Sequence, residues 1–375
     1  MTALRRRLEP RLLASWYAPR RDALALALAP LEAIYASGLW LRAALRRAGW
    51  RPAVRLPVPV VVVGNLTAGG SGKTPMVIWL ARQLVDRGLR PGLLCRGYGG
   101  HAGHWPQRVD ARSDAAAVGD EALLLALKTG CAVAAGPDRV AAARVLLADG
   151  GVDLLISDDG LQHAALARDL EIVMVHGRRR FGNRRLLPAG PLREPLQRLE
   201  RCDFVIEREV PGDLSPVPGG GGAGPGGDAN PSHQSHPGSP GSPGRLRLVR
   251  AALYRLAAGD DVPGLYGEEL ALSDLRGRRL HAFAGIADPG AFFAALRGLG
   301  ARPVEHARAD HHRYTARDFA GLGDEPVIMT AKDAVKCRRL APAGTRVLDI
   351  EMAPDDYTAG RLLQATLALR PRGAG

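Results

Sequence analysis

The chain has 375 residues, of which 46% are hydrophobic and 24% are charged. This composition is typical of a globular protein of about two domains and excludes a collagenous, coiled-coil or wholly disordered chain. The net charge of +13 invites a nucleic-acid interpretation, but the excess lies in residues 1–55 and 176–201 and only 5% of the residues are aromatic. We therefore expect no nucleic-acid partner. The four scattered cysteines indicate neither a disulfide framework nor a zinc module and favour a reducing compartment.

Residues 1–55 form a candidate membrane-associated segment. The apolar stretch from Ala23 to Leu41 has leucines and isoleucine near helical spacing, tryptophans towards its ends and arginines on both flanks. That pattern is typical of an amphipathic helix lying in a membrane interface. Pro30 and Glu32 in its middle argue against a clean membrane span. A helix packed on the core and a spanning helix are the alternatives, and no signal-peptide pattern is present.

Residues 56–210 show short β-branched runs alternating with helical stretches. We expect strands over 60–63, 93–95, 152–157, 172–175 and 204–206, and helices over 75–87, 119–128 and 138–148. Alternating strands and helices predict an α/β fold with a parallel sheet covered by helices.

The rest of the chain reads as an insert and a second lobe. Residues 211–244 hold 11 Gly and 8 Pro and are expected to form a disordered surface tether, His233 and His236 included. The α/β rhythm resumes in residues 245–375, with strands expected over 281–284 and 327–330 and a helix over 289–298. Two lobes separated by a region with a Gly/Pro-rich insert is the simplest organisation.

The strongest motif follows the first predicted strand, where a Gly-rich turn leads into a helix. Backbone N–H groups of such a turn wrap a polyphosphate, a lysine reaches the β/γ-phosphates, and a hydroxyl binds Mg²⁺. The ATP-binding candidates are therefore Thr67, Gly69, Gly70, Ser71, Gly72, Lys73 and Thr74. Thr67 stands where the usual P-loop pattern has Gly. The strand before the turn and the helix after it are nevertheless those expected of a P-loop NTPase-like sheet.

A second element delivers carboxylates to the same edge of the sheet. The apolar run 152–157 ends in Asp158 and Asp159. Ligands of doubly wound sheets lie beyond the carboxyl ends of the strands, so either aspartate is a candidate to share Mg²⁺ with Thr74. The alternative is that these aspartates merely form a turn.

The chain resembles the tetraacyldisaccharide 4'-kinases of lipid A biosynthesis. The resemblance starts with Gly64–Pro75 and runs from about residue 10 to residue 365. Further motifs in register are Arg96–Gly100, Val118–Glu121, Gly136–Arg139, Asp158–His163, Leu187–Glu194, Ala284–Ile286, Asp310–His312 and Thr330–Lys336. Two departures are Ala331, where the family leads us to expect Glu, and the long insert at 211–244.

The resemblance implies a reaction and a location. It implies transfer of the γ-phosphate of ATP, with Mg²⁺, to the 4'-hydroxyl of tetraacyldisaccharide 1-phosphate, giving lipid IVA. The enzyme would act at the cytoplasmic face of the bacterial inner membrane, as a peripheral or N-terminally anchored protein.

The resemblance also implies residue roles. Lys73 would stabilise the transferring phosphoryl group, Asp120 would act as the base, and His311 would orient it or share the proton. These two residues belong to opposite lobes. The candidates for binding substrate phosphate are Arg96, Arg139 and Arg193.

Two other classes of P-loop protein stay open from the residues alone. A GTPase-type switch needs an Asn-Lys-x-Asp guanine reader, and none of the four lysines lies in that sequence. A membrane-surface ATPase that drives a partner would lack a lipid acceptor, so dependence of turnover on the lipid would distinguish it.

Overall fold

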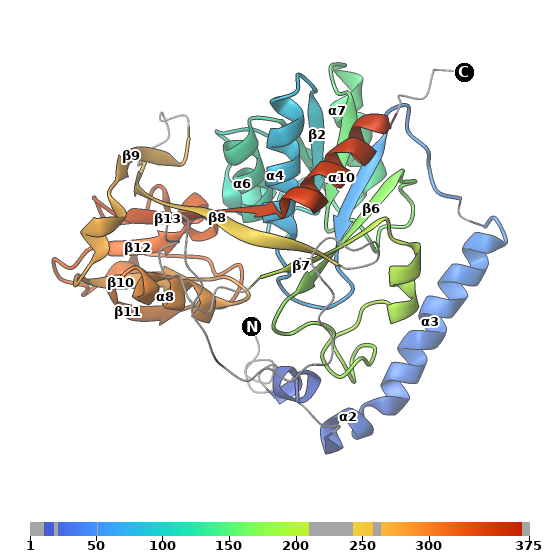
Figure 1. Cartoon of the computed structure of the whole chain (residues 1–375), viewed down its shortest axis with the longest axis horizontal. Coiled ribbons are helices and arrows are strands. Elements are labelled where there is room, and N and C mark those ends of the chain that lie inside the picture. The colour runs from blue at the N-terminus through green and yellow to red at the C-terminus, as the bar shows by residue number, and fades with distance from the viewer. Residues whose placement is uncertain (1–10, 19–21, 51, 210–242, 258–263, 370–375) are drawn as a thin grey trace. The chain divides into compact units, whose positions relative to one another are not determined.

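The computed structural model describes residues 11–18, 22–50, 52–209, 243–257 and 264–369 (Figure 1). The chain divides into two compact units. Unit 1 comprises Met1–Glu209 and Arg361–Gly375, and unit 2 comprises Val210–Gly360. Most of the expected Gly/Pro-rich insert, with His233 and His236, lies outside the described residues.

Unit 1 is an α/β unit whose strands lie in the order β7-β6-β1-β5-β2-β4-β3. All neighbouring strands are parallel except β3, which runs antiparallel to β4. The strands are β1 (Val60–Gly64), β2 (Pro91–Cys95), β3 (Gln107–Val109), β4 (Ala132–Ala135), β5 (Leu154–Asp158), β6 (Leu170–His176) and β7 (Phe204–Arg208). The helices are α2 (Ala23–Ala27), α3 (Ala29–Arg47), α4 (Lys73–Val85), α5 (Ala115–Val118), α6 (Asp120–Thr129) and α7 (Arg139–Ala148), with a 3-10 turn over Leu196–Arg201.

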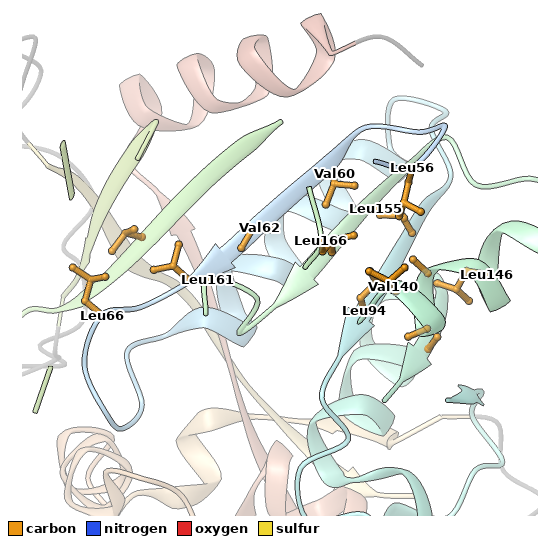
Figure 2. Packing of buried hydrophobic residues seen from close by; sticks show 14 of the residues in the cluster. Leu56, Val60, Val62, Leu66, Leu94, Val140, Leu146, Leu155, Leu161 and Leu166 are labelled. Carbon is orange, nitrogen blue, oxygen red and sulfur yellow. The ribbon is translucent and has the colours of Figure 1, made fainter. Parts of the chain in front are cut away.

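The central strand β1 explains why this sheet is buried on both faces. Successive strand residues point to opposite faces, and all five residues of β1 are buried. Val60 and Val62 belong to a cluster that includes Val140 and Leu146 of α7 (Figure 2). A run of valines, which are stiff and β-branched, suits a parallel strand covered on both sides.

Unit 2 holds the remaining strands and a core of its own. Its strands lie in the order β11-β10-β12-β13-β8, with β9 beside β8, and β10, β11, β12 and β13 run parallel. Strand β8 is antiparallel to both β13 and β9. The strands are β8 (Gly244–Leu256), β9 (Tyr266–Leu270), β10 (Arg279–Ala284), β11 (Arg302–Ala307), β12 (Val327–Thr330) and β13 (Arg346–Pro354).

The core of unit 2 forms where α8 packs on this sheet. Phe292, Phe293 and Leu296 of α8 cluster with buried residues of β10 and β12. The helices are α8 (Pro289–Gly298), α9 (Ala331–Cys337) and α10 (Asp356–Ala368), with 3-10 turns over Leu272–Leu275 and Ala316–Phe319. From Arg361 onward α10 groups with unit 1.

These elements confirm the predicted α/β class, and each strand and helix expected from the sequence is present with small shifts in its ends. Helix α4 begins at Lys73, two residues before the expected start. The sequence prediction omitted β3, β4, β8, β9, β11 and β13 and the helices α5, α9 and α10. Strand β8 begins where the Gly/Pro-rich insert was expected to end, so the composition of the insert hid its start.

The N-terminal apolar stretch forms two helices instead of one. Helix α2 ends at Ala27 and α3 restarts with Pro30 in its first turn, a position where the missing N–H of proline costs nothing. One face of α3 is docked on unit 1: Glu32 pairs with Arg185, and the Tyr35 hydroxyl donates to the Arg193 carbonyl at 2.8 Å.

The opposite face of α3 is apolar and exposed. It carries Leu31, Ile34, Leu41 and Leu45, of which Ile34 is 69% exposed, and no residue of α3 is fully buried. We call these four residues the exposed apolar stripe. The core-helix alternative is therefore wrong for the stripe. Within the described ranges, no helix is both long and apolar enough to cross a membrane.

Candidate active site

The P-loop forms between β1 and α4. Gly72 adopts φ 88° immediately before α4, and no side chain caps this helix. Its first N–H groups are therefore available to a phosphate, and the helix dipole favours an anion there. The Ser71 side-chain oxygen is buried, and it has no hydrogen-bond partner among the residues that the structure describes. A buried hydroxyl of this kind is suited to a hydrogen bond with a ligand.

The side chain of Lys73 is aimed by two unit 1 residues. Its ammonium donates to Asn65 Oδ1 at 3.2 Å and lies 3.5 Å from Asp159 Oδ1. Asn65 in turn donates from Nδ2 to the Gly69 carbonyl at 3.2 Å, which ties it to the loop. Sequence reasoning missed Asn65, although it lies inside the P-loop motif. Its amide is the device that holds the lysine over the loop.

Thr74 and Asp158 meet as expected of a metal-binding pair. The Thr74 hydroxyl donates to Asp158 Oδ2 at 2.9 Å. The other oxygen of Asp158, Oδ1, is buried and has no hydrogen-bond partner. Burial, and after it the nearby carboxylate of Glu121, raises the pKa of Asp158 to about 7. The nearby ammonium of Lys73 offsets this effect only in part. Glu121 was quoted within a motif but was not predicted as a site residue.

Substitution of Asp158 by Asn tests this electrostatic cost. An Asp normally has a pKa near 4, and the folded-state value is about 7. Below about pH 4 the folded and unfolded states are both protonated; as pH rises to about 7 the unfolded state loses its proton first, and the wild type loses stability. We expect Asp158→Asn to be more stable than the wild type without metal, by a margin that grows from about pH 4 to 7 and is then constant.

Thermal midpoints measured in chelator between pH 4 and 8 check this expectation. Asp153→Asn is the matched control, because Asp153 pairs with Arg90 and its pKa is lowered by that hydrogen bond. Removing this carboxylate should therefore not stabilise the protein. Equal midpoints of wild type and Asp158→Asn throughout the range would contradict an incompletely compensated charge at position 158.

Asp159 is engaged differently from Asp158. Its carboxylate accepts two hydrogen bonds from Arg193 Nη1, at 3.1 and 3.2 Å, and also faces Lys73. Burial opposes ionisation, but these two cations prevail and lower the pKa of Asp159. Arg193, expected to bind substrate phosphate, thus lies beside the P-loop lysine. The same segment is attached to α3 through Tyr35, which connects the exposed apolar stripe to the site.

The other two predicted arginines occupy contrasting positions. Arg139 is 2% exposed, and its guanidinium donates to the carbonyls of Gly136 at 2.6 Å and Asp158 at 3.3 Å. This position argues that Arg139 supports the end of β5 instead of contacting a substrate phosphate. Arg96 follows β2 and is exposed. It lies at the carboxyl end of the parallel sheet, the edge that carries the P-loop.

Asp120 begins α6 and is held against the loop after β2. It is buried, and its Oδ1 accepts from the Glu121 N–H at 2.9 Å. Gly119 precedes it with φ 93°, and a Cβ there would lie 2.7 Å from the Tyr98 carbonyl oxygen. Only glycine fits this close approach, which brings Asp120 next to the Arg96–Gly100 motif.

His311 lies in unit 2, in the loop after β11. Its backbone has φ 59°, and its Nε2 lies 3.4 Å from the ammonium of Lys332. The neighbouring His312 is used otherwise, since its Nε2 lies 3.1 Å from Asp318 Oδ1. Ala331, the departure from the expected Glu, is the first residue of α9 and immediately precedes Lys332.

Comparisons with known proteins agree with this geometry. A family model described as tetraacyldisaccharide-1-P 4'-kinase matches residues 24–368. A tetraacyldisaccharide 4'-kinase of Alkalilimnicola ehrlichii is 47% identical over 95% of this chain and 96% of that protein. One from Pseudomonas paraeruginosa is 44% identical over 92% of this chain and 93% of that protein. The crystal structure of LpxK from Aquifex aeolicus in complex with ATP has a TM-score of 0.68 and 28% identity, covering 92% of this chain and 98% of that one.

Proposed function

The chain belongs to the tetraacyldisaccharide-1-phosphate 4'-kinase family, and from that premise we propose that it phosphorylates the 4'-hydroxyl of tetraacyldisaccharide 1-phosphate with ATP. The product would be lipid IVA of the lipid A pathway. The observation that carries this proposal is the P-loop lysine Lys73, held by Asn65 and facing the carboxylate of Asp159 next to the Thr74–Asp158 pair.

The P-loop residues of this chain bind and orient the triphosphate. Backbone N–H groups from Gly69 to Thr74 surround it, Ser71 offers an unused hydroxyl, and Lys73 neutralises the β/γ-phosphates. Asp159 contacts both Lys73 and Arg193. Since phosphate oxygens are strong acceptors for both cations, we infer that these two side chains also bind the phosphates of the nucleotide.

The residues present fit a divalent cation. Thr74 and Asp158 would hold Mg²⁺, because Asp158 Oδ1 is a buried carboxylate oxygen without a partner and hard cations prefer such oxygens. Asp159 and Glu121 add negative charge nearby. When bound, Mg²⁺ would supply positive charge that offsets the negative charge developing on the transferred phosphoryl group.

The acceptor hydroxyl needs a base, because its own proton is held too tightly at pH 7. We assign that task to Asp120, whose carboxylate is buried at the start of α6, and a supporting role to His311. Arg96, exposed beyond β2, is the unit 1 cation we assign to the anionic headgroup.

The substrate is a lipid, and the protein offers a surface suited to a bilayer. The exposed apolar stripe of α3 and the arginines Arg42 and Arg47 beside it, both exposed, fit an interfacial helix among anionic headgroups. We place the protein peripherally on the cytoplasmic face of the bacterial inner membrane, where ATP is present.

The double variant Ile34→Glu, Leu41→Glu tests this surface. Each buried aliphatic side chain contributes about 1.5–3 kcal/mol, so we expect co-sedimentation with phosphatidylglycerol vesicles to weaken by about 100-fold or more. ATP binding should be unchanged. The matched control is Val249→Glu, which alters an exposed apolar residue of unit 2 that is 60% exposed. Unchanged sedimentation of the double variant would refute the interfacial role of α3.

The reaction itself is tested with γ-labelled ATP, Mg²⁺ and the lipid disaccharide. Label entering the lipid supports the kinase. ATP hydrolysis that ignores the lipid would instead support a membrane-surface ATPase, and preference for GTP with no lipid labelling would support a switch protein.

A further inference from the structure

The loop that carries His311 is held in a conformation that its sequence does not favour. His311 adopts φ 59°, the left-handed region that is unfavourable for residues with a Cβ. Conformations of this kind persist where surrounding contacts determine them, and they cluster at functional sites. The contacts that hold His311 therefore bear on what it does.

Asp310 and Lys332 both make contacts of this kind. Asp310 Oδ1 accepts from the His311 backbone N–H at 3.1 Å, which closes the turn. The same oxygen accepts from Lys332 Nζ at 3.1 Å, and that ammonium also lies 3.4 Å from His311 Nε2. Lys332 is mostly buried, with its side chain 17% exposed. One ammonium thus contacts both the carboxylate that shapes the turn and the imidazole.

Helix α9, which carries Lys332, is anchored by its next residue. Asp333 is fully buried and accepts from the Gly285 N–H at 2.9 Å and the Thr330 hydroxyl at 2.7 Å. A Cβ at Gly285 would lie 2.9 Å from Asp333 Oδ1 and 3.2 Å from the Ala309 carbonyl oxygen. The end of β10, the start of α9 and the loop before His311 are therefore in direct contact.

The second lysine of this helix has another task. Lys336 Nζ lies 2.9 Å from Asp333 Oδ1 and 5.2 Å from the centre of the Tyr314 ring. It compensates the buried carboxylate of Asp333. The two lysines of α9 thus divide their roles, with Lys336 supporting the fold and Lys332 facing the turn of His311.

We propose that Lys332 is the positioning residue that fixes the ring orientation and tautomer of His311. An ammonium has donors only, so the nitrogen that faces it must be an acceptor. Asp310 Oδ2 lies 3.7 Å from the same Nε2, farther than the 3.4 Å to the ammonium. Nε2 of His311 therefore carries the lone pair, and the proton of the neutral ring lies on Nδ1. The Nδ1–H of this tautomer is a donor suited to a carboxylate or substrate oxygen. The inference rests on the proposed function of His311 and deepens it.

Kinetics of single and double variants test the proposal. We expect Lys332→Ala to lower kcat by about 10- to 100-fold with KM for ATP within about twofold, and Lys332→Arg to restore part of the loss. In a His311→Ala background, Lys332→Ala should lower kcat by less than about twofold more, because the ring it positions is gone. The matched control is Arg317→Ala, which removes one exposed cation from the same unit.

The outcomes separate this inference from the proposed function. If His311→Ala is impaired while Lys332→Ala has wild-type kcat, or if the two losses multiply fully, the positioning role is overturned and the role of His311 stands. If His311→Ala is silent, the proposed role of His311 fails first.

A second measurement does not depend on activity. Nitrogen-15 spectra of labelled histidines at pH 8, assigned with His311→Gln, report the tautomer of His311. We expect Nδ1 to carry the proton in the wild type and the preference to be lost in Lys332→Met, which keeps the length of the side chain. A protonated Nε2 in the wild type, or the same tautomer in both proteins, would overturn the proposal.

Discussion

Lys73→Ala is expected to lower the rate of phosphoryl transfer by about 10²- to 10³-fold or more, with only a modest loss of lipid binding. The ammonium of Lys73 faces the P-loop through Asn65 and Asp159, so its main effect falls on the charge of the transferring phosphoryl group. We therefore expect binding of the acceptor lipid to depend only weakly on this cation.

Initial rates with labelled ATP, and vesicle-bound lipid in a separate binding assay, give the two readouts. Arg87→Ala is the matched control: Arg87 follows the other end of α4, where its guanidinium bonds Gln83 in an exposed position. That variant removes the same charge and should keep wild-type turnover. Wild-type turnover in Lys73→Ala would reject the P-loop assignment.

The P-loop and the aspartates at the end of β5 were predictable from the sequence. Both lie at the carboxyl end of a strand, and the carboxyl ends of parallel strands meet at the same edge of the sheet. The pairing of Thr74 with Asp158 across the sheet was expected for that reason. The different roles of Asp158 and Asp159 were not predictable, because they depend on the position of Arg193, which is distant in the sequence.

Arg139 shows why the positions of other site residues could not be predicted from the sequence. Its motif predicted a phosphate contact, yet the side chain turns inward to the carbonyls of Gly136 and Asp158. Those carbonyls lie at the ends of β4 and β5, which are brought close by the order β5-β2-β4. A single sequence does not contain that order. Burial of a charged group is thus decided by tertiary structure.

For helix α3, too, tertiary contacts decide which side is exposed. Its amphipathic pattern suits a core helix and a membrane helix equally well. The distinction comes from long-range contacts: Glu32 binds Arg185 and Tyr35 binds the Arg193 carbonyl, so the side that carries these two residues is docked and the apolar stripe is exposed. The sequence predicts the exposed apolar stripe as an apolar side of the helix, but only the contacts of the other face show that this side is exposed.

The acceptor side of the reaction carries the second large expected effect. Asp120→Ala should lower kcat by about 10²- to 10⁴-fold with nearly unchanged affinity for ATP, because a positioned base contributes that much to proton removal. His311→Ala should behave likewise. If the two residues act as a unit, the double variant should lose far less than the product of the single losses.

Asp120→Asn separates a base from a residue that only supports the start of a helix. Asp120 Oδ1 accepts from the Glu121 N–H at the start of α6, and an asparagine can keep that hydrogen bond while losing the proton-accepting carboxylate. We expect Asp120→Asn to retain the thermal midpoint of the wild type and to be as impaired in kcat as Asp120→Ala. A rate near the wild type in Asp120→Asn would reduce the residue to a structural role.

His312 provides the matched control for His311. Its ring packs edge-on against Tyr314 with 4.9 Å between centroids, and its Nε2 contacts Asp318. His312→Ala should therefore lower the thermal midpoint, and its effect on kcat should be smaller than that of His311→Ala. If His312→Ala is the damaging change and His311→Ala is silent, the catalytic assignment moves by one residue. If the losses of Asp120→Ala and His311→Ala multiply fully, the two side chains act independently, because an imidazole that orients a carboxylate has nothing left to orient once that carboxylate is removed.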